Sequence, residues 1–186
     1  AENIHNGLVV GNMSVYTWWY IRRSYGLLDQ NNGSITKRGY MMAQYSKWVR
    51  PGYRRTEVTE QPNTGVLVSA YKGDNNKVVI IAVNKGSDVT QEFSVSGQTL
   101  KNVDRYRTTG SENLAETKGM ETNGGNFFAQ LPANSVSTFV CTIAGDHGVD
   151  GSGADVAPGT TPIEPDSNGY YFHDTFENGV DDWEAR

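Results

Sequence analysis

The residues with the clearest capacity for chemistry form one short segment near the start of the chain. Residues 18–26 have the sequence WWYIRRSYG, which places two adjacent arginines, Arg22 and Arg23, among wide aromatic rings. Flat aromatic rings stack on the apolar faces of pyranose sugars, and a guanidinium binds a carboxylate through two parallel hydrogen bonds. Together these residue types indicate recognition of a sugar that carries an acid.

The same segment also has a purely structural interpretation, with aromatic core residues on a strand and arginines that are solvated or paired at its rim. Side chains alternate between the two faces of a strand. Alternation would therefore form two sets: Trp18, Tyr20 and Arg22 on one face, and Trp19, Ile21 and Arg23 on the other. The pattern alone does not choose between the two arginines, and both interpretations stay open at this point.

The elements that would position this segment follow a recognisable order. Residues 13–21 are apolar, rich in aromatic and β-branched types and uncharged, which predicts a strand buried on both faces, centred on residues 15–21. Weak helical spacing precedes it in residues 1–12. A second helix is expected over residues 37–49, with Thr36 as its N-cap and Pro51-Gly52 as its end. This order predicts the closing part of an α/β barrel, whose strands carry functional residues at their C-terminal ends.

From residue 53 the pattern changes to a period of two, with turns rich in Gly, Asn and Asp between the apolar stretches. Seven short strands are expected: 53–59, 65–72, 77–84, 90–95, 103–108, 127–131 and 135–143. Such a succession predicts an antiparallel β-sandwich over residues 53–144. The lone cysteine, Cys141, lies in the apolar run of the last strand and is expected to be a small buried hydrophobe rather than a nucleophile.

Composition and charge exclude several classes of function. The net charge of -5 over 186 residues argues against a nucleic-acid partner, and no apolar run is long enough to suggest a membrane partner. The three histidines (His5, His147 and His173) lie far apart without metal-ligand spacing, so no metal or cofactor is expected.

The second half of the chain ends in two further parts. Residues 145–169 are rich in Gly, Asp, Pro, Ser and Thr and contain no aromatic residue, which predicts a flexible linker. Residues 170–186 are aromatic again and look like the truncated start of a carbohydrate-binding module. Both ends of the chain look cut, so we expect a fragment of a longer protein.

Three motifs carry a resemblance to a known family. Residues 16–26 (YTWWYIRRSYG), 35–40 (ITKRGY) and 49–53 (VRPGY) closely resemble glycoside hydrolase family 30, and within it the glucuronoxylan endo-1,4-β-xylanases of subfamily 8. Residues 68–72, 79–85 and 131–136 look like the side β-sandwich of that family. The resemblance covers roughly residues 1–143.

The resemblance implies a fold that is mainly β: the last strand and helix of a (β/α)8 TIM barrel in residues 1–52, followed by the antiparallel side β-sandwich. It also implies a secreted, retaining enzyme that hydrolyses glucuronoxylan next to a (4-O-methyl)glucuronic acid branch. The two catalytic glutamates of the family come from earlier barrel strands, so no catalytic residue is expected in this chain, and the isolated chain is expected to be inactive.

By the same resemblance the glucuronate contact falls on Arg23, with Trp19, Tyr20 and Tyr25 as walls of its pocket and Arg22 as the alternative arginine. Two other functions also fit parts of the sequence. One is a non-catalytic carbohydrate-binding or structural sandwich formed by residues 53–144. The other is a different family 30 glycosidase, such as a glucosylceramidase-like hydrolase, against which the Arg22-Arg23 pair in its aromatic context argues.

Overall fold

The computed structural model describes residues 1–73 and 76–144, which fall within one compact unit, Ala1–Gly148. Two helices, α1 (Glu2–Leu8) and α2 (Lys37–Ser46), precede the strands. The strands are β1 (Arg54–Thr56), β2 (Val66–Lys72), β3 (Lys77–Asn84), β4 (Val89–Ser94), β5 (Leu100–Thr108), β6 (Ala115–Thr117), β7 (Asn126–Leu131) and β8 (Ser135–Ile143). The predicted linker and the predicted start of a further module lie outside the described residues.

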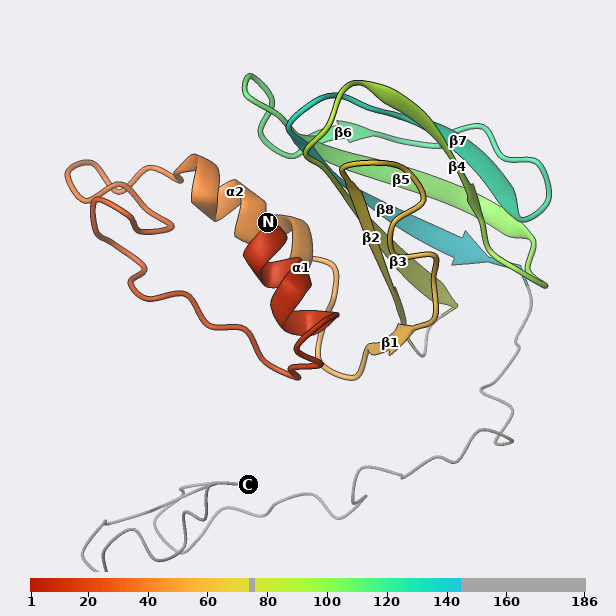
Figure 1. Cartoon of the computed structure of the whole chain (residues 1–186), viewed down its shortest axis with the longest axis horizontal. Helices are drawn as coiled ribbons and strands as arrows, with labels where there is room; N and C mark the ends of the chain where they lie inside the picture. The colour runs from red at the N-terminus through yellow and green to blue at the C-terminus, as the bar shows by residue number, and fades with distance from the viewer. Residues whose placement is uncertain (74–75, 145–186) are drawn as a thin grey trace, which may run out of the picture. The chain divides into compact units, whose positions relative to one another are not determined.

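The strands form two antiparallel sheets that face each other (Figure 1). The larger has six strands in the order β1-β2-β3-β8-β5-β6, and the smaller pairs β4 with β7. The prediction of a mainly β chain with an antiparallel sandwich is confirmed, and β3 and β8 have the predicted bounds. Strand β6 was not predicted from the sequence, because its three residues, Ala-Glu-Thr, show no apolar alternation.

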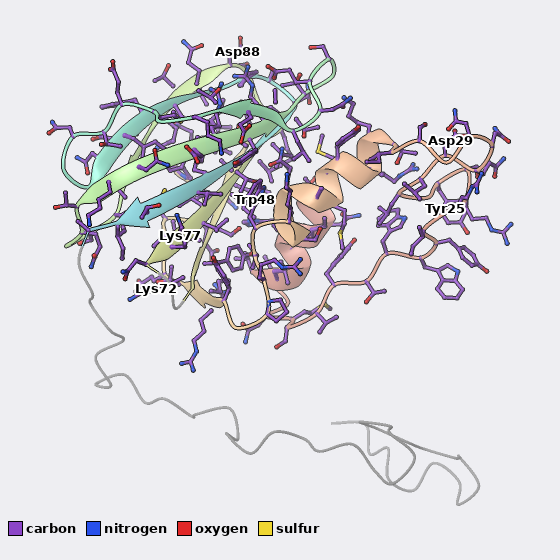
Figure 2. The ribbon with its side chains drawn as sticks, turned by 180° about the vertical axis from the view of Figure 1, so that it is seen from behind. Tyr25, Asp29, Trp48, Lys72, Lys77 and Asp88 are labelled. Carbon is purple, nitrogen blue, oxygen red and sulfur yellow. The ribbon has the colours of Figure 1, made fainter. Side chains whose placement is uncertain are left out.

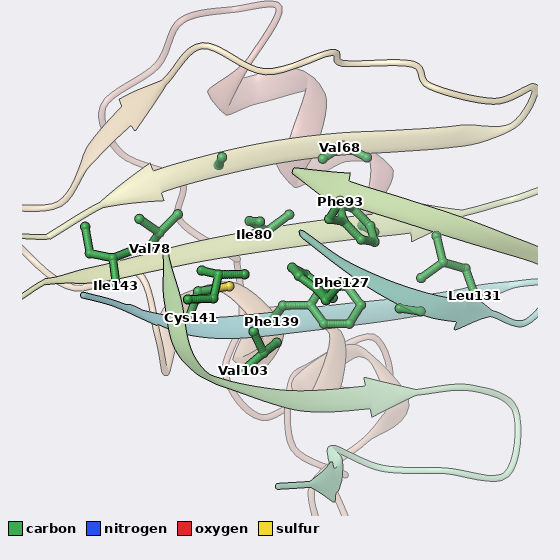
Figure 3. Packing of buried hydrophobic residues seen from close by; sticks show 14 of the residues in the cluster. Val68, Val78, Ile80, Phe93, Val103, Phe127, Leu131, Phe139, Cys141 and Ile143 are labelled. Carbon is green, nitrogen blue, oxygen red and sulfur yellow. The ribbon is translucent and has the colours of Figure 1, made fainter. Parts of the chain in front are cut away.

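Between the two sheets lies an aromatic and aliphatic core (Figure 3). Its centre is a triangle of Phe93, Phe127 and Phe139, whose ring centroids are 5.0 to 5.1 Å apart. The triangle joins both sheets, since Phe93 and Phe127 come from the small sheet and Phe139 from β8. Cys141 is fully buried in the same core, as predicted.

The opposite face of the six-stranded sheet is covered by the helices (Figure 1). Alternate residues of β2 and β3 therefore belong to different clusters: Val68 and Ile80 face the sandwich interior, whereas Leu67 and Ile81 pack with residues of α1 and α2. Burial on both faces explains why β3 is an uninterrupted apolar run although the sheet is antiparallel.

Helix α2 begins as predicted at Thr36, whose Oγ1 accepts a hydrogen bond from the backbone amide of Gly39 at 3.2 Å. The helix ends at Ser46, and a turn continues through residues 47–49, where the Trp48 ring stacks on Tyr106 with centroids 4.0 Å apart. The first helix, α1, is shorter than the residues 1–12 predicted for it.

The predicted strand over residues 15–21 is wrong for this structure. Residues 13–21 belong to no strand of the described chain, and the side chains of Val15 and Trp19 are 72% and 71% exposed. A strand needs a neighbour that takes up its backbone hydrogen bonds. The described residues supply only an isolated bridge between Arg22 and Leu28 beyond its end. The assignment of residues 1–52 to a barrel stays a prediction.

Candidate functional site

The segment that follows, residues 19–36, folds into a compact loop before α2, and we call it the arginine loop (Figure 2). It is held by backbone hydrogen bonds: Leu28 N donates to Ile21 O and Gly26 N to Arg23 O, both at 2.8 Å. The loop therefore has a defined conformation without belonging to a sheet.

Three of the four predicted site residues lie together on this loop. The rings of Trp19 and Tyr20 have centroids 4.3 Å apart and are tilted by 38°, and the peptide bond between them is cis. The guanidinium carbon of Arg23 lies 4.7 Å from the centre of the Tyr20 ring. All three side chains are exposed, with Tyr20, at 36%, the least so. They form an open aromatic–arginine cluster.

The fourth predicted residue, Tyr25, lies on the same loop (Figure 2) and is also exposed. Its carbonyl oxygen accepts a hydrogen bond from the indole Nε1 of Trp18 at 3.1 Å. Among the described residues, no ring or cation contact joins Tyr25 to the other three. The structure thus brings Trp19, Tyr20 and Arg23 together and leaves Tyr25 beside them.

The two adjacent arginines have different surroundings. Arg22 donates from its Nη2 to the carbonyl oxygen of Asn31 at 3.2 Å. Arg23 lies over an aromatic ring, and in the described part of the chain no carboxylate forms an ion pair with it. The expectation from alternation, that Arg23 shares a face with Trp19 and not with Tyr20, is wrong, because this backbone is irregular rather than extended.

Asp29 closes the tip of the loop. Its Oδ1 accepts from the backbone amides of Asn31 at 2.8 Å and Asn32 at 3.1 Å. These two amides, from Asn32 first and Asn31 second, hold the pKa of the Asp29 carboxyl below its ordinary value. The Asp29 carboxylate therefore binds backbone groups of the loop itself. It helps to fix Asn31, whose carbonyl oxygen accepts the hydrogen bond from Arg22.

Gln44, which anchors α2 to the sheet, was not predicted from the sequence. The side chain is fully buried; its Nε2 donates to Thr108 Oγ1 at 2.8 Å, and its Oε1 accepts from Thr138 Oγ1 at 2.5 Å. The available signal was its position, since residue 44 falls on the apolar stripe of α2 together with Met41 and Tyr45. A polar residue on such a stripe indicates a buried hydrogen-bonded contact.

Acidic side chains of the sandwich are engaged in surface ion pairs. Glu112 accepts two hydrogen bonds from Arg107, both 2.6 Å long, and this contact holds the pKa of the Glu112 carboxyl below its ordinary value. Glu116 pairs with Lys118 at 2.6 Å. These contacts give both carboxylates a structural partner. Within the described part of the chain, neither helix is long and apolar enough to span a membrane.

Comparison with known proteins shows which family the sandwich resembles. Residues 54–139 match the family model described as "Glycosyl hydrolase family 30 beta sandwich domain". "Glucuronoxylanase XynC" of Bacillus subtilis (strain 168) is 50% identical over 141 residues, which cover 75% of this chain and 33% of that protein. The sandwich is thus similar to the β-sandwich domain of glycosyl hydrolase family 30.

Two solved structures give the same result. The GH30 endoxylanase from Clostridium papyrosolvens C71 is 43% identical with a TM-score of 0.72, and the match covers 76% of this chain and 36% of that one. The subfamily 8 xylanase Xyn30A from Clostridium acetobutylicum is 40% identical, also with a TM-score of 0.72, covering 76% and 37%. This chain carries the β-sandwich domain of glycosyl hydrolase family 30, and it spans about a third of the length of the curated relatives it matches.

Proposed function

We propose that this chain is part of a secreted, retaining endo-β-1,4-xylanase that hydrolyses glucuronoxylan next to a (4-O-methyl)glucuronic acid branch, and that the arginine loop binds the acid of that branch. The names of the relatives, a glucuronoxylanase and a subfamily 8 xylanase, support the substrate class. The observation that carries the proposal is the exposed guanidinium of Arg23 over Tyr20, without a carboxylate partner in the described chain.

The chemistry of the cluster suits a uronic acid. A guanidinium offers two parallel N–H donors that match the two oxygens of a carboxylate, whereas a lysine ammonium offers only a point charge. The ring of Tyr20 beneath Arg23 restricts the guanidinium through a cation–π contact. Trp19 presents a largely exposed indole beside it, a surface on which a pyranose ring can stack.

Arg22 is the weaker candidate for the carboxylate contact. One terminal nitrogen of its guanidinium already donates to a backbone carbonyl of the loop, so binding a ligand through that nitrogen would compete with an existing hydrogen bond. Arg23 lacks such a bond among the described residues and keeps its full set of donors. We therefore favour Arg23 over Arg22 because of what surrounds each side chain, and not because of their order in the sequence.

Catalysis would come from elsewhere in the longer protein. A retaining glycosidase uses two carboxyl groups about 5–5.5 Å apart, one as acid/base and one as nucleophile. In the proposed enzyme both glutamates lie on barrel strands outside this chain, residues 1–52 complete that barrel, and residues 170–186 begin a carbohydrate-binding module. The partner is the xylan polysaccharide, with no role for a nucleic acid or a membrane.

The proposal is tested by Arg23→Ala in the full-length enzyme, with hydrolysis measured on glucuronoxylan and on undecorated xylan. Loss of a charge-assisted bidentate contact should lower kcat/KM on glucuronoxylan by about tenfold or more and leave the undecorated substrate nearly unchanged. Arg22→Ala is the matched control and should have the smaller effect. An equal loss on both substrates would refute the carboxylate role, provided that Arg23→Ala unfolds at the wild-type temperature, as expected for an exposed side chain.

A further inference from the structure

The hydroxyl of Thr36 makes contacts in two directions. Towards α2, its Oγ1 accepts from the amide of Gly39 and caps the helix. Towards the arginine loop, the same hydroxyl lies 2.9 Å from the carbonyl oxygen of Gly26 and 3.0 Å from that of Leu27, and it donates its hydrogen to this pair. The backbone amide of Thr36 also donates to Leu27 O at 2.9 Å. One residue thus joins the loop to the start of the helix.

Close backbone packing around Thr36 leaves the loop little freedom. A Cβ added at Gly39 would lie 2.4 Å from the carbonyl oxygen of Leu27, so helix and loop approach as only a glycine permits. A Cβ added at Gly26 would lie 2.6 Å from the backbone nitrogen of Arg23. Gly26, whose carbonyl Thr36 contacts, is therefore packed directly against the backbone of Arg23.

The helix is in turn fixed on the sandwich. Gln44 holds the middle of α2 to β5 and β8 through its buried hydrogen bonds with Thr108 and Thr138. At the first turn, Lys37 Nζ donates to Glu112 O at 3.1 Å and to the side chain of Asn113, both in the turn between β5 and β6. A continuous series of polar contacts thus runs from the sheet through α2 to the arginine loop.

Resting on the proposed function, we propose that Thr36 is a positioning residue: its hydroxyl fixes the arginine loop on α2, and through Gln44 and Lys37 the sandwich sets the place of the Arg23 guanidinium. Thr36 acts through the loop backbone and does not itself contact the sugar. The sandwich then contributes to selection of the acid-bearing substrate by holding the arginine loop in place.

The two roles of the hydroxyl can be separated by substitution. Serine keeps both the donor and the acceptor. An ionised aspartate still accepts from the Gly39 amide and is as good an N-cap as serine, but it has no hydrogen to donate and its charge repels the carbonyl oxygens of Gly26 and Leu27. Thr36→Asp therefore removes the loop contact while keeping the helix cap. Thr90→Asp, on the exposed face of β4, controls for the added negative charge.

In the full-length enzyme we expect Thr36→Asp to raise KM on glucuronoxylan about tenfold, with kcat and the rate on undecorated xylan close to wild type, because the part-buried carbonyls of Gly26 and Leu27 lose this donor and the loop shifts locally. Thr36→Ser and Thr90→Asp should match the wild type. Hydrogen exchange should be faster in residues 21–36 of Thr36→Asp and unchanged in α2, and its unfolding temperature should stay the same.

The outcomes distinguish this proposal from the one on which it rests. If Arg23→Ala is selective for glucuronoxylan but Thr36→Asp behaves like Thr36→Ser in KM and exchange, the positioning role is refuted and the carboxylate role stands. If Arg23→Ala is not selective, the carboxylate role is refuted and the positioning role with it. A parallel loss of rate on both substrates by Thr36→Asp, together with a lower unfolding temperature, would show a merely structural threonine and also refutes the proposal.

Discussion

Two regions of the chain, the sandwich and residues 13–36, each contain an uninterrupted apolar run, but only the runs of the sandwich are buried. Val79 on β3 is fully buried, with β2 and β8 on either side, whereas Val15 is 72% exposed and lies in no sheet. Both valines belong to runs of apolar residues. The difference is whether the chain supplies neighbours for the backbone, which teaches that an apolar run specifies a strand only together with its partners.

The two regions are also stabilised differently. Apolar burial on both faces of the six-stranded sheet dominates the sandwich. Short-range hydrogen bonds to the backbone, such as those to Asp29 Oδ1 and from Thr36, dominate the arginine loop. Substitutions that remove apolar volume should therefore affect the first region strongly and the second weakly.

The largest effect is expected for Phe139→Ala, which removes one corner of the aromatic triangle between the sheets and two of its three ring contacts. Truncation of a buried phenylalanine should lower the free energy of unfolding of this chain by about 3–5 kcal/mol, measured by urea denaturation. Phe128→Ala is the matched control, since Phe128 is 62% exposed on the outer face of β7, and it should change the value by less than about 0.5 kcal/mol. Similar losses in both variants would remove the distinction drawn between core and surface.

A smaller effect is expected for Gln44→Leu, which keeps the volume of the side chain but removes its hydrogen bonds to Thr108 and Thr138. The hydroxyl of Thr108 still accepts from Leu114 N, and that of Thr138 still donates to the backbone carbonyl of residue 44, so the lost side-chain hydrogen bonds should cost only about 1 kcal/mol in the same measurement. Gln130→Leu, at an exposed position of β7, is the control. Wild-type stability of Gln44→Leu would show that apolar packing alone holds α2 on the sheet.

The smallest effect concerns pH and His5 of α1, which is buried and whose Nδ1 has no hydrogen-bond partner in the described chain. Burial lowers the pKa of the His5 imidazole below its ordinary value of 6.5, although Glu60 and Glu2 oppose this and Arg55 adds to it. Below about that pH the unfolded chain binds a proton that the folded chain does not, so the free energy of unfolding should fall as the solution becomes more acid and stay level above.

His5→Leu removes the group that titrates and should flatten the dependence between pH 6.5 and the acid range in which carboxylates protonate. Urea denaturation of both proteins over this range measures the difference. The same slope in wild type and variant would assign the pH dependence to other groups.

Most of the sandwich could be predicted from the sequence, because its strands alternate between two buried environments and its turns contain Gly, Asn and Asp. The N-cap at Thr36 was likewise predictable, since capping is a local property. The strand over residues 15–21 was not correctly predicted, because strand formation depends on neighbours that periodicity cannot supply.

The candidate site was predictable in its residue types and not in its geometry. The family resemblance assigned the role to Arg23, and the structure shows what separates it from Arg22: contact with a ring in one case, with a backbone carbonyl in the other. Alternation failed here, since the backbone turns within the segment. The loop contacts of Thr36 were equally hidden, because they depend on carbonyls 9 and 10 residues away in the sequence.

Burial of the six-stranded sheet on both faces limits how this sandwich can be exchanged between proteins by recombination. A recombination junction near residue 53 would transfer the strands without α1 and α2, and Leu67, Tyr71 and Ile81 would then face water in the recipient. Junctions before α1 transfer the sheet with both of its apolar faces covered. Successful exchanges between genes should therefore carry the two helices and the strands as a single heritable block.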